Sequence, residues 1–221
     1  MKYKAIIFDM DGTIVDSEKI WQQATHKLIE RRGIAITPQL NEQLTQELNG
    51  CALTQSCELL KKLLLLDDHL DNLIKEQSDL ACSLYSTSLE FIEGFLSFHT
   101  QVTQIPLKIG IATNADDATL HLTRTILPLE QLFGQHIYGI SHVGHKGKPH
   151  PDIYLHAAKQ LEIDPTECIA IEDSLHGVRA ARAAGMYCIG INTSKRPEQT
   201  KEAHLVINGY EEIDLTAILK G

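Results

Sequence analysis

Six short apolar segments, rich in β-branched and aromatic side chains, recur along the chain and predict buried strands. Helical patterns separate most of them: one predicted helix spans residues 151–161, and another begins at the N-cap Ser174 and ends at Gly185. Alternating strands and helices are typical of a parallel sheet with helices on both faces, the doubly wound α/β class. The predicted strands are residues 3–8, 108–112, 136–140, 168–171, 187–191 and 204–207.

Residues 16–88 break this alternation, because they contain no convincing strand. An all-helical block after the first strand of a parallel sheet indicates an inserted cap domain. We therefore predict a cap at residues 16–88 and an α/β core at residues 1–15 and 89–221. The four leucines at 63–66 are expected on the buried side of a helical bundle. The predicted cap helices, three or four in number, are residues 18–32, 38–48, 54–66 and 70–86.

Composition and charge argue against several classes of function. The chain has 221 residues, a net charge of −9 and an isoelectric point of about 5.6, so a nucleic acid is not an expected partner. No stretch approaches the roughly 18 apolar residues that span a bilayer, and no signal peptide is predicted. Five cysteines without a C-x-x-C pair indicate free thiols and a cytoplasmic protein. Nothing in the sequence demands more than a monomer.

The first predicted strand runs directly into Asp9 and Asp11, which are followed by Gly12 and Thr13. Two carboxylates at the end of a central strand are costly to bury unless they are paired, but they can hold a divalent cation beside a nucleophile. The carboxyl end of a parallel strand is where α/β sheets place their ligands. We expect the functional site here, with Gly12 turning the chain where a Cβ would crowd the site.

Three further segments place polar side chains at or near the ends of other predicted strands. Because these strand ends converge on one crevice, the sequence gathers carboxylates, a hydroxyl, an amide and an amine beside the two aspartates. Each segment alone has a structural interpretation: a solvated turn, a helix cap, or a surface lysine. Their joint occurrence makes the pattern specific. The added residues are Thr113, Asn114, Lys148, Glu172 and Asp173.

This set of groups fits phosphoryl transfer. A carboxylate can attack phosphorus and form an aspartyl-phosphate, and Asp9 is the candidate nucleophile. Mg²⁺ prefers oxygen ligands and would relieve the repulsion between Asp9 and a phosphate dianion. Asp9 and Asp173 are the expected direct ligands, Glu172 is expected to hold a bound water, and Asp11 completes the predicted metal set.

The other groups have expected roles around the phosphate. Asp11 lies two residues after the nucleophile and is the predicted general acid and base for the leaving group. The Thr113 hydroxyl, the Asn114 amide, the Lys148 amine and backbone N–H groups after Asp9 are expected to bind the phosphate oxygens.

These residues resemble the motifs of the haloacid dehalogenase-like hydrolase superfamily along essentially the whole chain. The aspartates at 9 and 11 resemble its first motif, Thr113 its second, Lys148 its third and the pair Glu172 and Asp173 its fourth. The resemblance implies a Rossmann-like core, a small helical cap and a Mg²⁺-dependent aspartyl-phosphate mechanism. The founding dehalogenases use no metal and lack the second aspartate, so Asp11 and the fourth motif argue for phosphoryl transfer.

Residues 147–152 and 174–178 resemble the branch that contains β-phosphoglucomutase and small-molecule phosphatases. In the mutases an arginine of the cap grips the distal phosphate of a sugar bisphosphate, and here Leu53 stands at that position in an alignment that rests on Gly50 and Ser56. An apolar side chain cannot replace a bidentate arginine contact. This departure favours a phosphatase over a mutase.

Several smaller features have competing interpretations. The string His142, His145 and His150 could bind zinc, but a mobile basic loop that attracts phosphate fits it better, because no helix fixes its spacing. Trp21 and His26 could face the substrate, although a core tryptophan and a surface histidine are the default expectation. The pair at residues 195–196 is expected in a solvated loop, with contact to an anionic substrate as the alternative.

The sequence thus predicts a Mg²⁺-dependent phosphatase of small phosphate monoesters, such as a sugar or other metabolite phosphate. The alternative enzyme is a β-phosphoglucomutase-like phosphomutase. A catalytically idle binding module is a third possibility, but the full set of nucleophile and metal residues speaks against it. The cap is expected to close over the crevice, with hinges near residues 15–16 and 88.

Overall fold

The computed structural model describes residues 1–48, 51 and 53–220. Within these residues a six-stranded parallel sheet has the strand order β3-β2-β1-β4-β5-β6. The chain begins in the middle at β1 and builds one half of the sheet before the other, which is the predicted doubly wound topology. The strands are β1 (Ala5–Phe8), β2 (Lys108–Ala112), β3 (Ile137–Tyr138), β4 (Cys168–Glu172), β5 (Tyr187–Ile191) and β6 (Leu205–Ile207).

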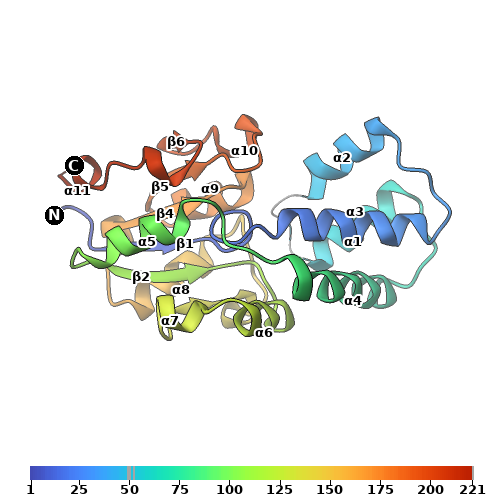
Figure 1. Cartoon of the computed structure of the whole chain (residues 1–221), viewed down its shortest axis with the longest axis horizontal. Helices are drawn as coiled ribbons and strands as arrows, with labels where there is room; N and C mark the ends of the chain where they lie inside the picture. Colours follow the sequence, from blue (N-terminus) through green and yellow to red (C-terminus); the bar gives the residue numbers. More distant parts are fainter. Residues whose placement is uncertain (49–50, 52, 221) are drawn as a thin grey trace.

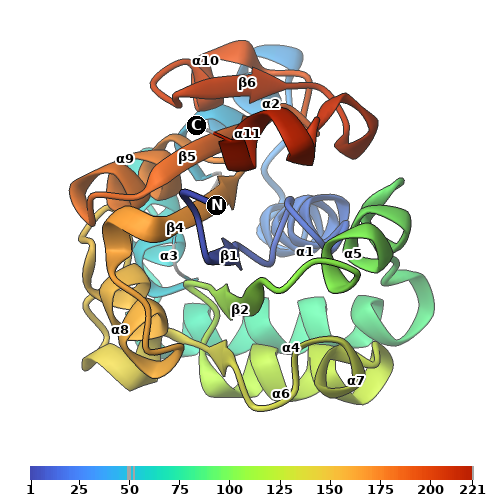
Figure 2. The same cartoon turned by 90° about the vertical axis from the view of Figure 1, so that its left-hand side faces the viewer.

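Strand β1 separates two apolar layers, because successive side chains of a strand point to opposite faces of the sheet. Ile6 and Phe8 pack in one layer with α5 and α7, whereas Ala5 and Ile7 pack in the other with α8 and α9. Figure 2 shows these two helix pairs on opposite sides of the sheet. The helices of this part are α5 (Phe95–Thr103), α6 (Asp117–Ile126), α7 (Leu129–Phe133), α8 (Asp152–Gln160), α9 (Leu175–Ala183), α10 (Pro197–Thr200) and α11 (Leu215–Lys220), with 3₁₀ turns η1 (Ile140–Val143), η2 (Pro165–Glu167) and η3 (Tyr210–Glu212).

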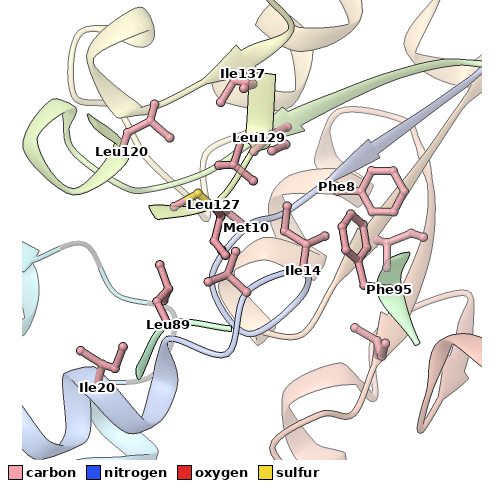
Figure 3. Close-up of a cluster of buried hydrophobic side chains, with 14 of the residues drawn as sticks. Phe8, Met10, Ile14, Ile20, Leu89, Phe95, Leu120, Leu127, Leu129 and Ile137 are labelled. Carbon is pink, nitrogen blue, oxygen red and sulfur yellow. The ribbon is translucent and has the colours of Figure 1, made fainter. Parts of the chain in front are cut away.

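An apolar cluster continues from the sheet toward the helical insert. The rings of Phe8 and Phe95 meet edge to face with centroids 5.8 Å apart. Met10 and Ile14, in the loop after β1, are fully buried in the same cluster (Figure 3). The loop that carries the two aspartates therefore rests on packed side chains and has little freedom to move.

Of the helices described between β1 and β2, the first four form the predicted all-helical insert. Figure 1 shows them at one end of the molecule, opposite the two chain termini. Helices α1 and α4 pack against each other, with the rings of Trp21 and Tyr85 in edge-to-face contact. We refer to this insert as the cap; its exact limits at residues 16 and 88 stay a prediction. The helices are α1 (Glu18–Glu30), α2 (Pro38–Leu48), α3 (Leu53–Leu63) and α4 (Leu70–Ser88).

The four-leucine run was predicted to be buried, and this is wrong for one of its members. Helix α3 ends at Leu63, and Leu65 adopts a left-handed backbone with 86% of its surface exposed. The N–H of Leu66 donates to the carbonyl oxygen of Lys61 at 3.0 Å, which closes the end of the helix, and the amine of Lys61 donates to the carbonyl oxygens of Leu66 and Asp68 beyond it. Leu66 is buried, and Leu63 and Leu64 are partly buried against the same apolar cluster.

Strand β3 and the prediction that no segment spans a membrane complete the comparison with the sequence. The predicted strand at 136–140 is shorter, because Ile140 begins the 3₁₀ turn η1 instead of continuing β3. Within the described part of the chain, no helix is both long and apolar enough to cross a membrane, as expected.

Candidate active site

The loop after β1 is fixed by hydrogen bonds from several parts of the core. The N–H of Asp9 donates to the carbonyl of Ile171 in β4 at 2.9 Å. The hydroxyls of Thr193 and Tyr210 donate to the carbonyls of Gly12 and Thr13 at 2.7 and 2.9 Å. These bonds hold the carboxylates of the loop at the carboxyl edge of the sheet.

Glycine is the only residue type that fits position 12. Its φ is +79°, in the left-handed region, and a Cβ there would lie 2.3 Å from Oδ2 of Asp173. The expectation that a side chain would crowd the site agrees with this geometry. The absence of a side chain at Gly12 allows the first and fourth motifs to approach each other.

Three buried carboxylates converge at this edge. Oxygen atoms of Asp9, Glu172 and Asp173 lie within 4.8 Å of one another. Burial raises the pKa of Asp9 to about 7 against the opposing effect of Lys148, and burial together with Asp9 and Glu172 raises the pKa of Asp173 well above its usual range. Like charges this close need a cation, and the donor set is all oxygen, so a divalent metal ion fits these three residues.

Lys148 supplies the positive charge that the protein itself brings to this group. Its Nζ lies 2.5 Å from Oδ1 of Asp9 and 2.6 Å from Oε1 of Glu172, and its side chain is only 3% exposed. Burial alone would lower the pKa of Lys148, but Asp9 and Glu172 outweigh it and raise that pKa, so the amine stays charged. Lys148 therefore joins the first and fourth motifs electrostatically.

Asn114 positions the loop that carries Lys148. Its Oδ1 accepts the backbone N–H of Lys148 at 2.9 Å. A Cβ on Gly147 would lie 2.5 Å from the same oxygen, so the two segments approach as closely as their backbones allow. Asn114 also lines the cavity described below; its predicted contact with phosphate stays a prediction.

Asp11 lies apart from the group of three carboxylates. Its carboxylate accepts hydrogen bonds from the hydroxyls of Ser17 and, at 3.4 Å, Thr113. Burial raises the pKa of Asp11, although the Ser17 hydroxyl opposes this effect. Thr113 thus contacts the predicted acid and base in this structure, and its role toward phosphate, like metal binding by Asp11, stays a prediction.

The carboxylate of Glu172 has two partners that the sequence analysis did not identify as site residues. The Tyr154 hydroxyl donates to its Oε1 at 2.6 Å, and the Ser174 hydroxyl donates to its Oε2 at 3.2 Å. Tyr154 follows Pro151 by one helical turn at the start of α8, and that position after the Lys148 loop is the only sequence signal that could have found it. Ser174 was expected only as an N-cap, a role it also has through Gly177.

A cavity of about 610 Å³ lies between this edge of the sheet and the cap. The predicted site residues Asp9, Asp11, Thr113, Lys148 and Asp173 line it from the sheet side, and Asn114 joins them. The cap side is lined by helices α1 to α4. The cavity therefore has room for a phosphate at the sheet and an organic group beneath the cap.

The cap wall of this cavity, as far as the structure describes it, contains no lysine or arginine. Leu53, the residue at the mutase arginine position, lines it; Asn49, Gly50 and Ala52 of the same alignment lie outside the described residues. Trp21 and His26 also line the cavity, as the alternative expectation for them required, although Trp21 packs against the apolar core as well. The cap wall offers mainly uncharged groups to a ligand.

The histidine string is divided by the fold. His145 and His150 line the cavity, whereas the ring of His142 packs near that of His156, with centroids 5.6 Å apart. Within the described residues, the only group of three or more potential metal ligands is Asp9, Glu172 and Asp173. The three histidines therefore do not form the zinc site considered from their spacing.

Arg196 connects core and cap. Its guanidinium forms an ion pair with Glu18 at the start of α1 and donates to the carbonyl of Thr45 in α2 at 2.9 Å. The side chain is only 15% exposed, so the expectation of a solvated loop is wrong at this residue. The two chain segments that link core and cap also pair, through a bridge between Val15 and Phe91.

Comparison with known proteins agrees with this arrangement. Residues 6–191 match the family model described as haloacid dehalogenase-like hydrolase. The fructose-1-phosphate phosphatase YqaB of Escherichia coli (strain K12) is 29% identical over 193 residues, which cover 86% of this chain and 97% of that protein. The β-phosphoglucomutase of Bacillus subtilis (strain 168) is 28% identical over 195 residues, which cover 85% of this chain and 83% of that protein.

A solved structure shows the same fold over the whole chain. A conserved haloacid dehalogenase-like protein of unknown function from Agrobacterium tumefaciens superimposes with a TM-score of 0.80 at 27% identity. The match covers 99% of this chain and 98% of that one. The chain belongs to the haloacid dehalogenase-like hydrolases, in the branch that contains phosphatases and β-phosphoglucomutase.

Proposed function

We propose that this hydrolase is a Mg²⁺-dependent phosphatase that cleaves small phosphate monoesters of sugars or related metabolites through an aspartyl-phosphate. The observation that carries the proposal is the convergence of three buried carboxylates, Asp9, Glu172 and Asp173, with the buried amine of Lys148. One relative is a fructose-1-phosphate phosphatase, which supports sugar phosphates as the substrate class.

The metal would be held by Asp9 and Asp173, with Glu172 and Asp11 as the further predicted members of the set. When bound, Mg²⁺ supplies positive charge between the nucleophile and the phosphate. Glu172 already accepts from Lys148 and Tyr154, which suits a carboxylate that holds the charged amine in place and reaches the metal through water.

Each residue of the site then has a separate role in the two half-reactions. An oxygen of Asp9 attacks phosphorus, while Lys148, Thr113 and Asn114 bind the phosphate oxygens. Asp11 donates its proton to the leaving alcohol, and burial, which raises the pKa of Asp11, suits this role because it shifts the carboxyl group toward its protonated form. Asp11 then removes a proton from the water that hydrolyses the aspartyl-phosphate.

The lack of lysine and arginine on the described cap wall supports a phosphatase over a phosphomutase. A mutase must bind a phosphate at both ends of its substrate, and such binding needs a cation or several donors on the cap side. The described cap wall offers no lysine or arginine and places Leu53 in the cavity. A single phosphate at the sheet edge, with an uncharged leaving group under the cap, fits this arrangement.

The test is phosphate release with and without Mg²⁺ from a panel of sugar phosphates, nucleotides, phosphoglycolate and β-glucose 1-phosphate. Metal-dependent release from a few esters is the expected result and names the substrate class. Glucose 6-phosphate formed from β-glucose 1-phosphate without phosphate release would support the mutase instead. An idle binding module would give neither product nor Mg²⁺ uptake in calorimetry.

A further inference from the structure

A line of hydrogen bonds crosses the buried interior of the cap and ends at the cavity. The thiol of Cys57 in α3 donates to Oε1 of Gln77 in α4 at 3.0 Å, and Nε2 of Gln77 donates to Oγ1 of Thr25 in α1 at 2.9 Å. The exposed fractions of the three residues are 0%, 2% and 5%. Gln77 and Thr25 both line the cavity. The line therefore joins three cap helices and reaches the space beneath them.

The amide of Gln77 has a defined orientation in this line. Its oxygen accepts from the Cys57 thiol, whose pKa is raised by burial, and its NH₂ group donates to Thr25. As a result Thr25 accepts a bond, and the proton of its own hydroxyl is left for another partner.

Four other helical threonines use that proton within the helix, where each hydroxyl donates to the carbonyl oxygen four residues earlier in the chain. Thr200, in the four-residue helix α10, is instead buried, and its hydroxyl has no partner among the described residues. Thr25 makes no such bond within the described part of the chain, although it lies in the middle of α1. A buried donor without an acceptor costs about 1–3 kcal/mol, so the open cavity is where its acceptor is expected. The four comparison residues are Thr45, Thr100, Thr123 and Thr125.

The charges around this position favour an uncharged acceptor. The cavity residues one turn before and one position after Thr25 are Gln22 and His26. Glu58 adds negative charge to the cap wall, whereas the charge of Glu18 is paired with Arg196 of the core. An anionic oxygen is therefore disfavoured beneath the cap, whereas a hydroxyl or carbonyl oxygen can accept the bond without that repulsion.

We infer that Thr25 is a specificity-determining residue whose hydroxyl donates a hydrogen bond to an uncharged oxygen of the leaving group. Gln77 holds the Thr25 hydroxyl in this orientation, and Cys57 holds Gln77. The inference rests on the proposed function and deepens it. It makes phosphate esters of polyhydroxylated alcohols better ligands than esters whose leaving group carries no oxygen beyond the ester bond.

The first test compares Thr25→Val, which keeps the shape but removes the hydroxyl, with Thr25→Ser, which retains the hydroxyl. The substrates are a panel of hexose and hexitol monophosphates and, as the probe without hydroxyls, phenyl phosphate. For the best polyol ester, Thr25→Val should lower kcat/KM about 3- to 10-fold, the loss expected for one neutral hydrogen bond. Thr25→Ser should restore most of it, and kcat/KM for phenyl phosphate should stay unchanged.

Two results would overturn the inference. Equal losses on the polyol ester and on phenyl phosphate would show that Thr25 only supports the fold of the cap. No loss on either substrate would show that its hydroxyl contacts no ligand. Should Thr25→Val not fold in thermal unfolding, Thr25→Ala carries the same expectation, because it also removes the hydroxyl.

A binding measurement separates this inference from the proposed function. Trp21, the single tryptophan of the chain, lines the cavity, so its fluorescence can report binding. Titrations of Asp9→Asn, with and without Thr25→Val, need no turnover. A preference for polyol esters that Thr25→Val removes would support the inference even if the wild-type chain released no phosphate. A preference that persists in Thr25→Val would overturn it even if the phosphatase activity is present.

Discussion

The sheet side and the cap side of the cavity differ in the kind of group they present. At the sheet edge, Asp9, Glu172, Asp173 and Lys148 are charged and at most 6% exposed. On the cap side, described residues such as Thr25, Gln77 and Leu53 are uncharged, and the ionic contact of Glu18 points toward Arg196 of the core. The buried charged groups thus lie on the rigid sheet wall, whereas the cap wall is mainly uncharged apart from Glu18 and Glu58.

This difference separates two tasks. Buried charges must be held in exact positions, because each one without its partner costs several kcal/mol, and strand ends with short loops provide that rigidity. Selection of a leaving group needs only a few weaker contacts. The cap supplies them from helices joined to the core by two linkers and by Arg196.

The largest effect is expected from the proposed nucleophile, Asp9, at the sheet edge. Asp9→Asn keeps the volume of the side chain but removes its nucleophilic oxygen, so turnover should fall by at least ~10³-fold. Phosphate release measures the loss, and thermal unfolding checks that the fold is intact. Substantial surviving phosphatase activity would exclude Asp9 as the nucleophile.

Removal of the Lys148 amine from these carboxylates should destabilise the fold. Lys148→Met leaves Asp9 and Glu172 buried without their cation, and the free energy of unfolding should fall by about 3–5 kcal/mol in the absence of metal. Urea unfolding measures it. Lys146→Met is the matched control, because the Lys146 side chain is 54% exposed and pairs with Asp152 at the surface; it should change stability by less than about 1 kcal/mol. Similar effects of both variants would contradict the assigned role of Lys148.

Because of the buried carboxylates, we expect the stability of the metal-free chain to depend on pH in an unusual way. The pKa of Asp9 is raised to about 7 and that of Asp173 is raised well above its usual range, so between pH 5 and pH 7 the folded state binds more protons than the unfolded state. Stability should therefore fall as the pH rises through this window, by at most about 1.4 kcal/mol per pH unit for each group.

Denaturation at pH 5 and pH 7, with and without Mg²⁺, measures this effect. The metal should restore stability at pH 7, because it binds the folded chain and favours the charged carboxylates. Asp9→Asn should weaken the pH dependence of the stability of the metal-free chain. A metal-free chain that gains stability between pH 5 and pH 7 would contradict the balance of charges at the sheet edge.

A cation on the cap wall should reduce the difference between the two sides. Leu53→Arg places a guanidinium in the cavity, and the dissociation constant of a sugar bisphosphate should fall about tenfold, as for a hydrogen bond to a charged group. Trp21 fluorescence measures binding, with Leu53→Gln as the uncharged control. An equal gain for a monophosphate would show that the guanidinium reaches the sheet-side phosphate instead.

The smallest effect is expected at the contact between core and cap. Arg196→Ala removes the ion pair with Glu18 and the bond to the Thr45 carbonyl, so a closed cap should be less populated and KM should rise about threefold. Lys195→Ala is the control, because Lys195 is exposed. An unchanged KM in Arg196→Ala would mean that the linkers alone hold the cap in place.

Much of the core was predictable because its signals are local. Strand β2 and the N-cap Ser174 lie where the pattern of apolar and polar residues placed them. The predicted helix at 54–66 instead ends at Leu63, because the chain turns at the left-handed Leu65 and the N–H of Leu66 donates to the carbonyl of Lys61. The outward turn of Leu65 depends on this contact, which the pattern of leucines does not contain.

The sequence by itself determined the α/β class, the helical insert and the gathering of Asp9, Lys148, Glu172 and Asp173, because the ends of parallel strands must meet at one edge. Only the tertiary structure decided the partners of these groups. Tyr154 reaches Glu172 from a helix, and Arg196 reaches the cap across 178 positions of the chain from Glu18. Such contacts depend on how separate elements pack. That packing cannot be predicted from the periodicity or the spacing of residues along the chain.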